Sequence, residues 1–164
     1  MSSSMTEPAP LMSSFHAVEA EWIDYNQHMN MGYYTVLFDR AADEAYAEIG
    51  FGPEYRDASG CTTYTAEFHV RYLRELKLGD RVQAAFRILD HDEKRFHSYQ
   101  ELIREDGTVV ATGEGIALHV DQSGPKVAPM PEAILARLRQ VAEQHGKLPR
   151  PETAGRGMGL RRRR

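Results

Sequence analysis

Seven consecutive residues, Asp24-Tyr25-Asn26-Gln27-His28-Met29-Asn30, hold a carboxylate, an imidazole and three amides. A carboxylate can attack an electrophilic carbonyl or remove a proton from water, and an imidazole or an amide can orient that water. We therefore predict that Asp24 is a nucleophile or general base, assisted by Asn26 and His28. A purely structural interpretation is also open, in which Asp24 forms an Asx turn and Asn30 caps a helix.

A long helix is predicted directly after this segment. Apolar residues recur there at helical spacing, and Gly50 supplies a stop. The first N–H groups of a helix are unpaired, and its macrodipole favours negative charge. A thioester carbonyl held at the N–H groups of Met31, Gly32 and Tyr33 would be polarised as in an oxyanion hole. The apolar positions are Tyr34, Leu37, Phe38, Ala41, Ala42, Ala45, Tyr46 and Ile49.

Alternating apolar and polar residues predict several strands around this helix. Asp106-Gly107 is a strong hairpin signal, and short connections require antiparallel neighbours. Small residues in the last strand permit a helix to approach the sheet closely, and Pro131 opens a short terminal helix. The order predicts an α+β fold, with one long helix on an antiparallel sheet. The expected strands are residues 15–23, 64–72, 82–88, 95–104 and 108–120.

The length of 164 residues predicts one domain, and its two ends differ in composition from the middle. Residues 1–14 are rich in Ser, Met and Pro, and residues 146–164 carry Gly, Pro and the run Arg161 to Arg164. We predict a flexible N-terminal tail at 1–14, a folded domain at 15–145, and a basic flexible C-terminal tail at 146–164.

Charge and cysteine content argue against several functional classes. The net charge is −4, and much of the positive charge lies in the C-terminal tail, so the domain itself is acidic and lacks the basic face of a nucleic-acid-binding protein. Cys61 is the only cysteine, which excludes an internal disulfide and fits a reducing cytosol. No apolar run approaches the roughly 18 residues that a membrane span needs. No metal-ligand cluster appears either, so we predict a cytoplasmic protein without a metal, nucleic-acid or membrane partner.

The run from Trp22 to Tyr34 resembles the hotdog-fold thioesterases, in which a loop of pattern Asp-x-Asn-x-His-x-Asn leads into the long central helix. Plant acyl-carrier-protein thioesterases share this pattern, and their functional residues map to Asp24, Asn26 and His28. Residues 68–75, with the following Leu78-Gly79-Asp80, and Pro129-Met130-Pro131 are similar as well. The resemblance covers residues 15–145 and implies a hotdog fold, an antiparallel sheet wrapped around one long central helix.

The betainyl-CoA thioesterases of carnitine degradation, some of them fused to carnitine dehydrogenase, are a closer likeness. Residues 22–30, 72–75, 89–95, 118–121 and 148–156 resemble theirs. The chain shows no Gly-x-Gly-x-x-Gly dinucleotide motif, so a free-standing form is expected. The likeness implies hydrolysis of a small acyl-CoA without a cofactor. It also implies a homodimer or a dimer of dimers, with sites at the subunit interface.

If the acyl group is betaine, aromatic faces should surround its quaternary ammonium. Aromatic residues cluster near the loop, and Trp22 and Tyr33 are the preferred candidates among them. Two of the others fit the apolar periodicity and can equally belong to the core. The full set is Trp22, Tyr25, Tyr33, Tyr34 and Tyr64.

Charged residues outside the loop supply further candidates for substrate binding. Glu67, on the polar face of the second expected strand, resembles the extra carboxylate that hotdog enzymes often carry there. Arginine and lysine side chains can bind CoA phosphates, although each is more commonly a surface charge. The candidates are Arg71, Arg74, Lys94 and Arg95.

Two alternative functions remain at this stage. Hotdog enoyl-CoA hydratases carry Asp-x-Asn-Pro-x-His, with three positions from Asn to His, whereas Asn26 and His28 are two apart and Gln27 stands in place of Pro. A one-residue change redirects side chains in a tight loop, so the spacing counts against hydration. A non-catalytic acyl-CoA-binding protein is disfavoured only by the presence of Asp24.

Overall fold

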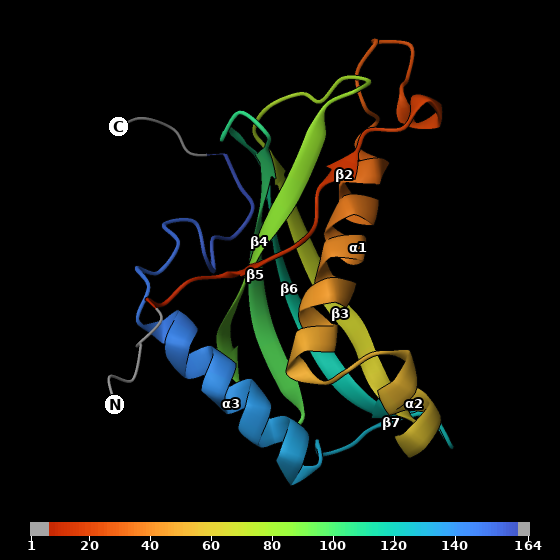
Figure 1. Ribbon diagram of the computed structural model, residues 1–164, viewed down its shortest axis with the longest axis vertical. Helices are drawn as coiled ribbons and strands as arrows, with labels where there is room; N and C mark the ends of the chain where they lie inside the picture. Colours follow the sequence, from red (N-terminus) through yellow and green to blue (C-terminus); the bar gives the residue numbers. More distant parts are fainter. Residues whose placement is uncertain (1–6, 161–164) are drawn as a thin grey trace, which may run out of the picture.

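The computed structural model describes residues 7–160, which form one antiparallel sheet with a long helix against it (Figure 1). The strand order is β1-β4-β5-β6-β3, with β2 also paired to β4 and β7 to β6. The strands are β1 (Leu11–Met12), β2 (His16–Ala17), β3 (Cys61–Tyr72), β4 (Arg81–His91), β5 (Arg95–Arg104), β6 (Val109–Asp121) and β7 (Lys126–Val127). The helices are α1 (Gly32–Ile49), α2 (Pro53–Ser59) and α3 (Glu132–Gly146), with a 3-10 turn at Ala20–Trp22.

Helix α1 begins and ends where its sequence predicts. The side-chain Oδ1 of Asn30 accepts the Gly32 N–H at 3.0 Å, which confirms its capping role. Gly50 ends the helix in the left-handed region, at φ 114°, where its N–H bonds to the Tyr46 carbonyl. The apolar stripe of α1 is buried against the sheet, with Leu37 and Phe38 almost completely inaccessible to solvent. The predicted hotdog arrangement of a sheet wrapped around a long helix is therefore confirmed.

The small residues of β6 make room for aromatic rings between the sheet and α1. A Cβ at Gly113 would lie 2.6 Å from the Phe68 ring and 3.1 Å from the Phe38 ring. A Cβ at Gly115 would lie 2.9 Å from the Phe68 ring. These contacts are shorter than side-chain packing allows, so the two glycines are needed for the Phe38–Phe68 pair to reach the sheet.

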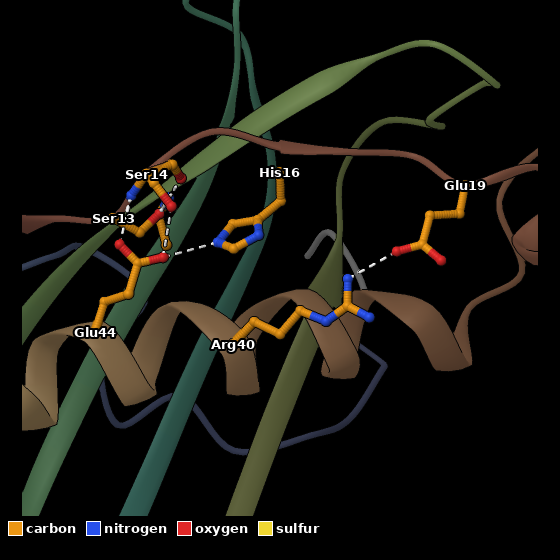
Figure 2. Close-up of polar contacts among 7 residues, drawn as sticks. Ser13, Ser14, His16, Glu19, Arg40 and Glu44 are labelled. Carbon is orange, nitrogen blue, oxygen red and sulfur yellow. Dashed lines mark hydrogen bonds and ion pairs between the residues drawn. The ribbon is translucent and has the colours of Figure 1, made fainter. Parts of the chain in front are cut away.

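The segment before α1, which pairs with β4 in the sheet, is also joined to α1 by polar contacts (Figure 2). Glu44 accepts hydrogen bonds from the backbone N–H and the hydroxyl of Ser14, each at 2.7 Å, and lies 3.0 Å from His16 Nε2. One turn earlier, Arg40 donates to Glu19 at 2.8 Å. These contacts connect β1, β2 and the 3-10 turn to α1, and so fix the chain that leads into the 24–30 loop.

Parts of both expected tails contact the sheet. Leu11 and Met12 pair with β4, and beyond α3 residues of the segment 149–155 form hydrogen bonds with side chains of the sheet. Tyr99 bonds to Thr153, and Glu114 accepts the Gly155 N–H at 2.7 Å. The domain bounds of 15–145 stay a prediction, although these contacts extend beyond them on both sides. Residues 1–6 and the run 161–164 lie outside the described residues.

One predicted strand needs correction, and one helix was missed. The strand expected at residues 15–23 is only the two residues of β2, because the chain then turns through the 3-10 helix to bury Trp22. Helix α2 was not predicted at all, since its seven residues contain no buried side chain and therefore no apolar periodicity. Among the helices of residues 7–160, none is both long and apolar enough to cross a membrane.

Candidate active site

The 24–30 loop is a tight hairpin that joins the first segment to α1. Ile23 and Met29 form an antiparallel bridge, and the N–H of Asp24 bonds to the His28 carbonyl at 3.0 Å. A hydrogen bond from the Gln27 N–H to the Asp24 carbonyl closes the turn. Gln27 then adopts φ 64°, the left-handed conformation that commonly follows a type I turn in a three-residue hairpin. This geometry brings both ends of the hairpin to the start of α1.

The carboxylate of Asp24 has one bonded and one open oxygen. Its Oδ1 accepts the Asn26 N–H at 2.8 Å, so the predicted Asx turn is confirmed. Within residues 7–160, no hydrogen bond or ion pair occupies Oδ2 of Asp24. The structural and chemical interpretations are therefore compatible, because one oxygen fixes the side chain and the other is free to accept a proton or attack a carbonyl.

An open cavity of about 350 Å³ lies over the loop. Five of the predicted site residues line it, and five further residues complete the lining: Met29, Tyr34, Tyr72, Leu73 and Glu75. Burial raises the pKa of the Tyr34 phenol at its edge, whose hydroxyl donates to the Arg74 carbonyl at 3.0 Å. We call this space the loop cavity, and its polar or partly polar lining includes Asp24, Asn26, His28, Met31, Arg74 and Glu75.

His28 is oriented by a carboxylate that the sequence-based prediction missed. Its Nε2 lies 3.0 Å from Glu75 Oε2, while the other oxygen of Glu75 lies 3.3 Å from the Lys77 ammonium. Glu75 follows β3, so the contact joins segments 47 positions apart. The available signal was the position of Glu75 in a stretch already recognised as similar to hotdog thioesterases, but spacing alone does not place it beside His28.

Fewer N–H groups are free at the start of α1 than the predicted oxyanion hole requires. The Gly32 N–H is bonded to the Asn30 side chain, and the Tyr33 N–H to the Asn30 carbonyl at 3.1 Å. Met31, which lines the loop cavity, is the position in this first turn whose N–H is unbonded within the described chain. A carbonyl bound here would thus meet one backbone donor, since the capping residue occupies the other two.

The aromatic pair predicted to hold an ammonium is occupied by a cation of the protein itself. Trp22 is 5% exposed and stacks on Tyr33, with ring centroids 5.2 Å apart. The guanidinium of Arg40 lies over the Trp22 ring at 5.1 Å from its centroid and is also paired with Glu19. Tyr25 is 90% exposed. None of Trp22, Tyr25 or Tyr33 lines the loop cavity, so a cage of these residues finds no support in this geometry.

The remaining predicted residues divide between the two ends of the sheet. Tyr72, at the loop end of β3, pairs with Ala111, whereas Arg95 pairs with Leu118 near the opposite end. Arg95 is already bound to Asp92, at 2.7 Å from its Nε. The predicted cations Lys94 and Arg95 therefore lie far from the loop in the described chain. Arg74 lines the loop cavity. Arg71 and Glu67 lie on β3 but do not line it.

No site for a metal is apparent in the described part of the chain. Within residues 7–160, no three His, Cys, Asp or Glu side chains are grouped closely enough to hold an ion.

The sequence from residue 18 to residue 138 matches the family model described as "Thioesterase-like superfamily". Among characterised relatives, the chain is 41% identical over 141 residues to a betainyl-CoA thioesterase of Pseudomonas aeruginosa, covering 85% of this chain and 89% of the relative. It is 38% identical over 162 residues to an L-carnitine dehydrogenase/betainyl-CoA thioesterase of Rhizobium meliloti. That match includes 98% of this chain but only 32% of the longer relative.

Solved structures agree with this family match. A Staphylococcus aureus protein in complex with CoA superimposes with a TM-score of 0.87 at 27% identity, covering 97% of this chain and all of that one. A putative thioesterase of Pseudomonas putida superimposes with a TM-score of 0.79 at 32% identity, covering 93% and 98% of the two chains.

Proposed function

The chain belongs to the thioesterase-like superfamily of thioester hydrolases, and from this premise we propose that it hydrolyses betainyl-CoA to betaine and CoA. One observation carries the choice of substrate: 41% identity to a betainyl-CoA thioesterase extends over nearly the whole of both chains. The free-standing P. aeruginosa relative matches this chain in extent, whereas the fused relatives are about three times longer.

The geometry of the loop cavity supports Asp24 as the reacting carboxylate. Its open Oδ2 either removes a proton from water as the water attacks the thioester carbonyl, or attacks the carbonyl itself to form an anhydride that water then hydrolyses. Both routes release CoA as a thiol and the acyl group as an acid. The Met31 N–H is positioned to stabilise the oxyanion, and Glu75 keeps His28 oriented toward the cavity.

We also propose that the enzyme works as a homodimer joined through β3. This 12-residue strand is an edge of the sheet, bonded to β6 on one side only within the described chain. Long unpaired edges are templates for pairing with another strand, and two-fold dimers are the commonest assemblies. Antiparallel pairing of two β3 strands would continue the sheet, with both α1 helices on the same face.

A three-substrate comparison tests the proposed activity. Released CoA thiol is measured with betainyl-CoA, a short straight-chain acyl-CoA and an aromatic acyl-CoA. We expect kcat/KM for betainyl-CoA to exceed the others by about tenfold or more, because each 1.4 kcal/mol of differential binding is a factor of ten. Equal rates on all three would refute the choice of substrate while leaving the thioesterase activity in place.

Sedimentation experiments test the dimer. Ala66 is exposed at the bulge in the middle of β3, so Ala66→Arg should produce monomers with little activity. Ser123→Arg, in an exposed turn that follows β6, is the matched control and should remain dimeric. A dimeric Ala66→Arg variant would place the interface elsewhere.

A further inference from the structure

A second cavity, of about 300 Å³, lies between α1 and the sheet and does not include any residue of the 24–30 loop. We call it the α1 groove. Its wall is largely apolar and aromatic, and it contains one carboxylate and no Lys, Arg or His side chain. The volume lies at the lower end of the range for small-molecule sites, roughly 300–1,000 Å³. The residues used below are Phe38, Asp39, Tyr46, Phe68 and Gln100.

Gln100 provides the first sign of a ligand. Its side chain is 2% exposed, yet its Oε1 has no hydrogen-bond partner within residues 7–160. A buried acceptor without a partner costs about 1–3 kcal/mol, so such atoms are rare unless they serve a purpose. Gln100 also lines the wall of the α1 groove, so its buried amide lies beside the cavity.

Asp39 provides the second sign, since its charge is not neutralised within the groove. Burial, followed by the charge of Asp39, raises the pKa of Asp43 on the next turn of α1. Burial and the same two carboxylates raise the pKa of the Tyr46 phenol, which therefore stays neutral. The adjacent cation Arg40 is occupied by Glu19 and the Trp22 ring. Asp39 itself is exposed to solvent, so its carboxylate is accessible to a cationic ligand in the groove.

Aromatic side chains provide the third sign. Phe38 and Phe68 form an edge-to-face pair with ring centroids 5.5 Å apart, and both line the groove beside Tyr46. Aromatic surface combined with a carboxylate suits a cation that carries its charge on methyl groups. A bare alkyl chain would gain nothing from Asp39, and an anionic acyl group would be repelled by it.

We propose that the α1 groove binds the trimethylammonium group of the acyl substrate, with Asp39 as counter-ion and the amide of Gln100 in the wall of the site. This assignment rests on the proposed function and identifies the residues that select its substrate. It replaces the Trp22–Tyr33 pair, whose open face is filled by Arg40.

The groove and the reacting carboxylate would come from different subunits. Met31 and Asp39 are eight residues apart, which is about 12 Å along a helix. Only one methylene separates the carbonyl from the ammonium in a betainyl group, so one chain cannot hold both at these positions. In an antiparallel β3–β3 dimer, the Tyr72 end of one strand lies beside the Cys61 end of the other. That arrangement brings the loop of each subunit toward the α1 groove of its partner.

The substrate pair betainyl-CoA and 3,3-dimethylbutanoyl-CoA tests the counter-ion, because the second replaces the charged nitrogen by carbon at the same shape. We expect Asp39→Asn to lower the ratio of kcat/KM for the charged over the neutral thioester by about tenfold or more. Glu48→Gln, which removes the same charge from an exposed position on α1 outside the groove, should keep the wild-type ratio.

The outcomes separate the two proposals. An unchanged ratio in Asp39→Asn, with both thioesters still hydrolysed, would overturn the groove as the ammonium site and leave the thioesterase function intact. If the wild-type enzyme hydrolyses neither thioester, the proposed function fails and the assignment of the groove fails with it.

Mixed dimers test the sharing of the site. Co-expressed Asp24→Asn and Asp39→Asn chains form heterodimers in which one site receives Asp24 and Asp39 intact from opposite subunits. Half of the dimers are then mixed, and each mixed dimer has one intact site of two, so about one quarter of all sites are intact. Activity on betainyl-CoA should therefore recover to about one quarter of the wild-type activity. No recovery above the two parent variants would show that one chain supplies both residues, and would overturn the shared site.

Discussion

The loop cavity and the α1 groove are built in different ways. Five residues that line the loop cavity come from the short segment 24–31, where the hydrogen bonds that close the turn, from the N–H groups of Asp24, Asn26 and Gln27, span two to four positions. The groove draws on α1, β3, β5 and β6, from Thr35 to Ala117. A reacting group can therefore be encoded in a short motif, whereas the pocket that selects the substrate depends on the whole sheet.

Asp24→Asn should have the largest effect and should act on the loop alone. The amide oxygen can still accept the Asn26 N–H, so the Asx turn is preserved while the reactive carboxylate is lost. We expect kcat to fall by about 10³-fold, or roughly 4 kcal/mol of transition-state stabilisation, with little change in thermal stability. Stopped assays of CoA release, together with melting curves, measure both quantities. Wild-type turnover on every thioester would remove Asp24 from the mechanism.

Lowering the pH should reduce the stability of the part of the core that lies next to the groove. His145 of α3 is 3% exposed, and its Nδ1 accepts the Ile88 N–H at 2.9 Å. Burial, followed by the charge of Arg87, lowers the pKa of His145 to about 4. Ile88 belongs to the cluster that also contains Ala42 and Ala117 of the groove wall.

The sign follows from the lowered pKa. The folded protein prefers neutral His145, so its contribution is fully present above the unfolded value of about 6.5 and is lost as the pH falls toward 4. Between pH 7 and pH 5 the free energy of unfolding should fall by about 2 kcal/mol at most. Urea titrations at pH 7 and pH 5 measure it, with His145→Gln as the comparison. An equal pH dependence in that variant would assign the effect to other groups.

Glu75→Gln tests whether the long-range contact to His28 contributes to the loop's chemistry. Losing the carboxylate should release His28 and lower kcat by about tenfold, with a smaller change in KM. Lys77→Ala is the matched control, since Lys77 contacts Glu75 from outside the cavity and should matter less. Steady-state kinetics that are the same for Glu75→Gln and wild type would make Glu75 a surface residue.

Gln100→Leu should separate stability from substrate selection in the groove. Replacing an unpaired buried amide by an apolar side chain of similar size should raise the free energy of unfolding by about 1 kcal/mol. The preference for betainyl-CoA over its neutral isostere should fall at the same time. Denaturant curves and the substrate ratio report the two effects, and a destabilised variant would mean that Gln100 has a structural role instead.

The contrast between the two regions also explains what could be predicted from the sequence. Helix α1, the strands β4 to β6 and the loop carboxylate follow from periodicity, turn residues and motif spacing, all of which are local. Glu75 beside His28, Arg40 over Trp22, and the α1 groove depend on contacts between distant segments. Aromatic residues close to the loop in sequence suggested a cage. In the folded protein, one of them, Trp22, is buried in the core, and Arg40 lies over its ring.

Gln27→Gly should have the smallest effect and tests whether the hairpin alone determines the loop. Gln27 has φ 64°, a conformation that costs a non-glycine residue about 1 kcal/mol or more, whereas glycine adopts it without strain. Part of that gain is offset by the larger entropy of glycine in the unfolded chain, so we expect a net stabilisation of about 0.5 kcal/mol. Because the side chain of Gln27 does not line the loop cavity, kcat should be unchanged. A large fall in kcat without loss of stability would mean that the amide of Gln27 takes part in the reaction, and that the loop's chemistry is not confined to Asp24, Asn26 and His28.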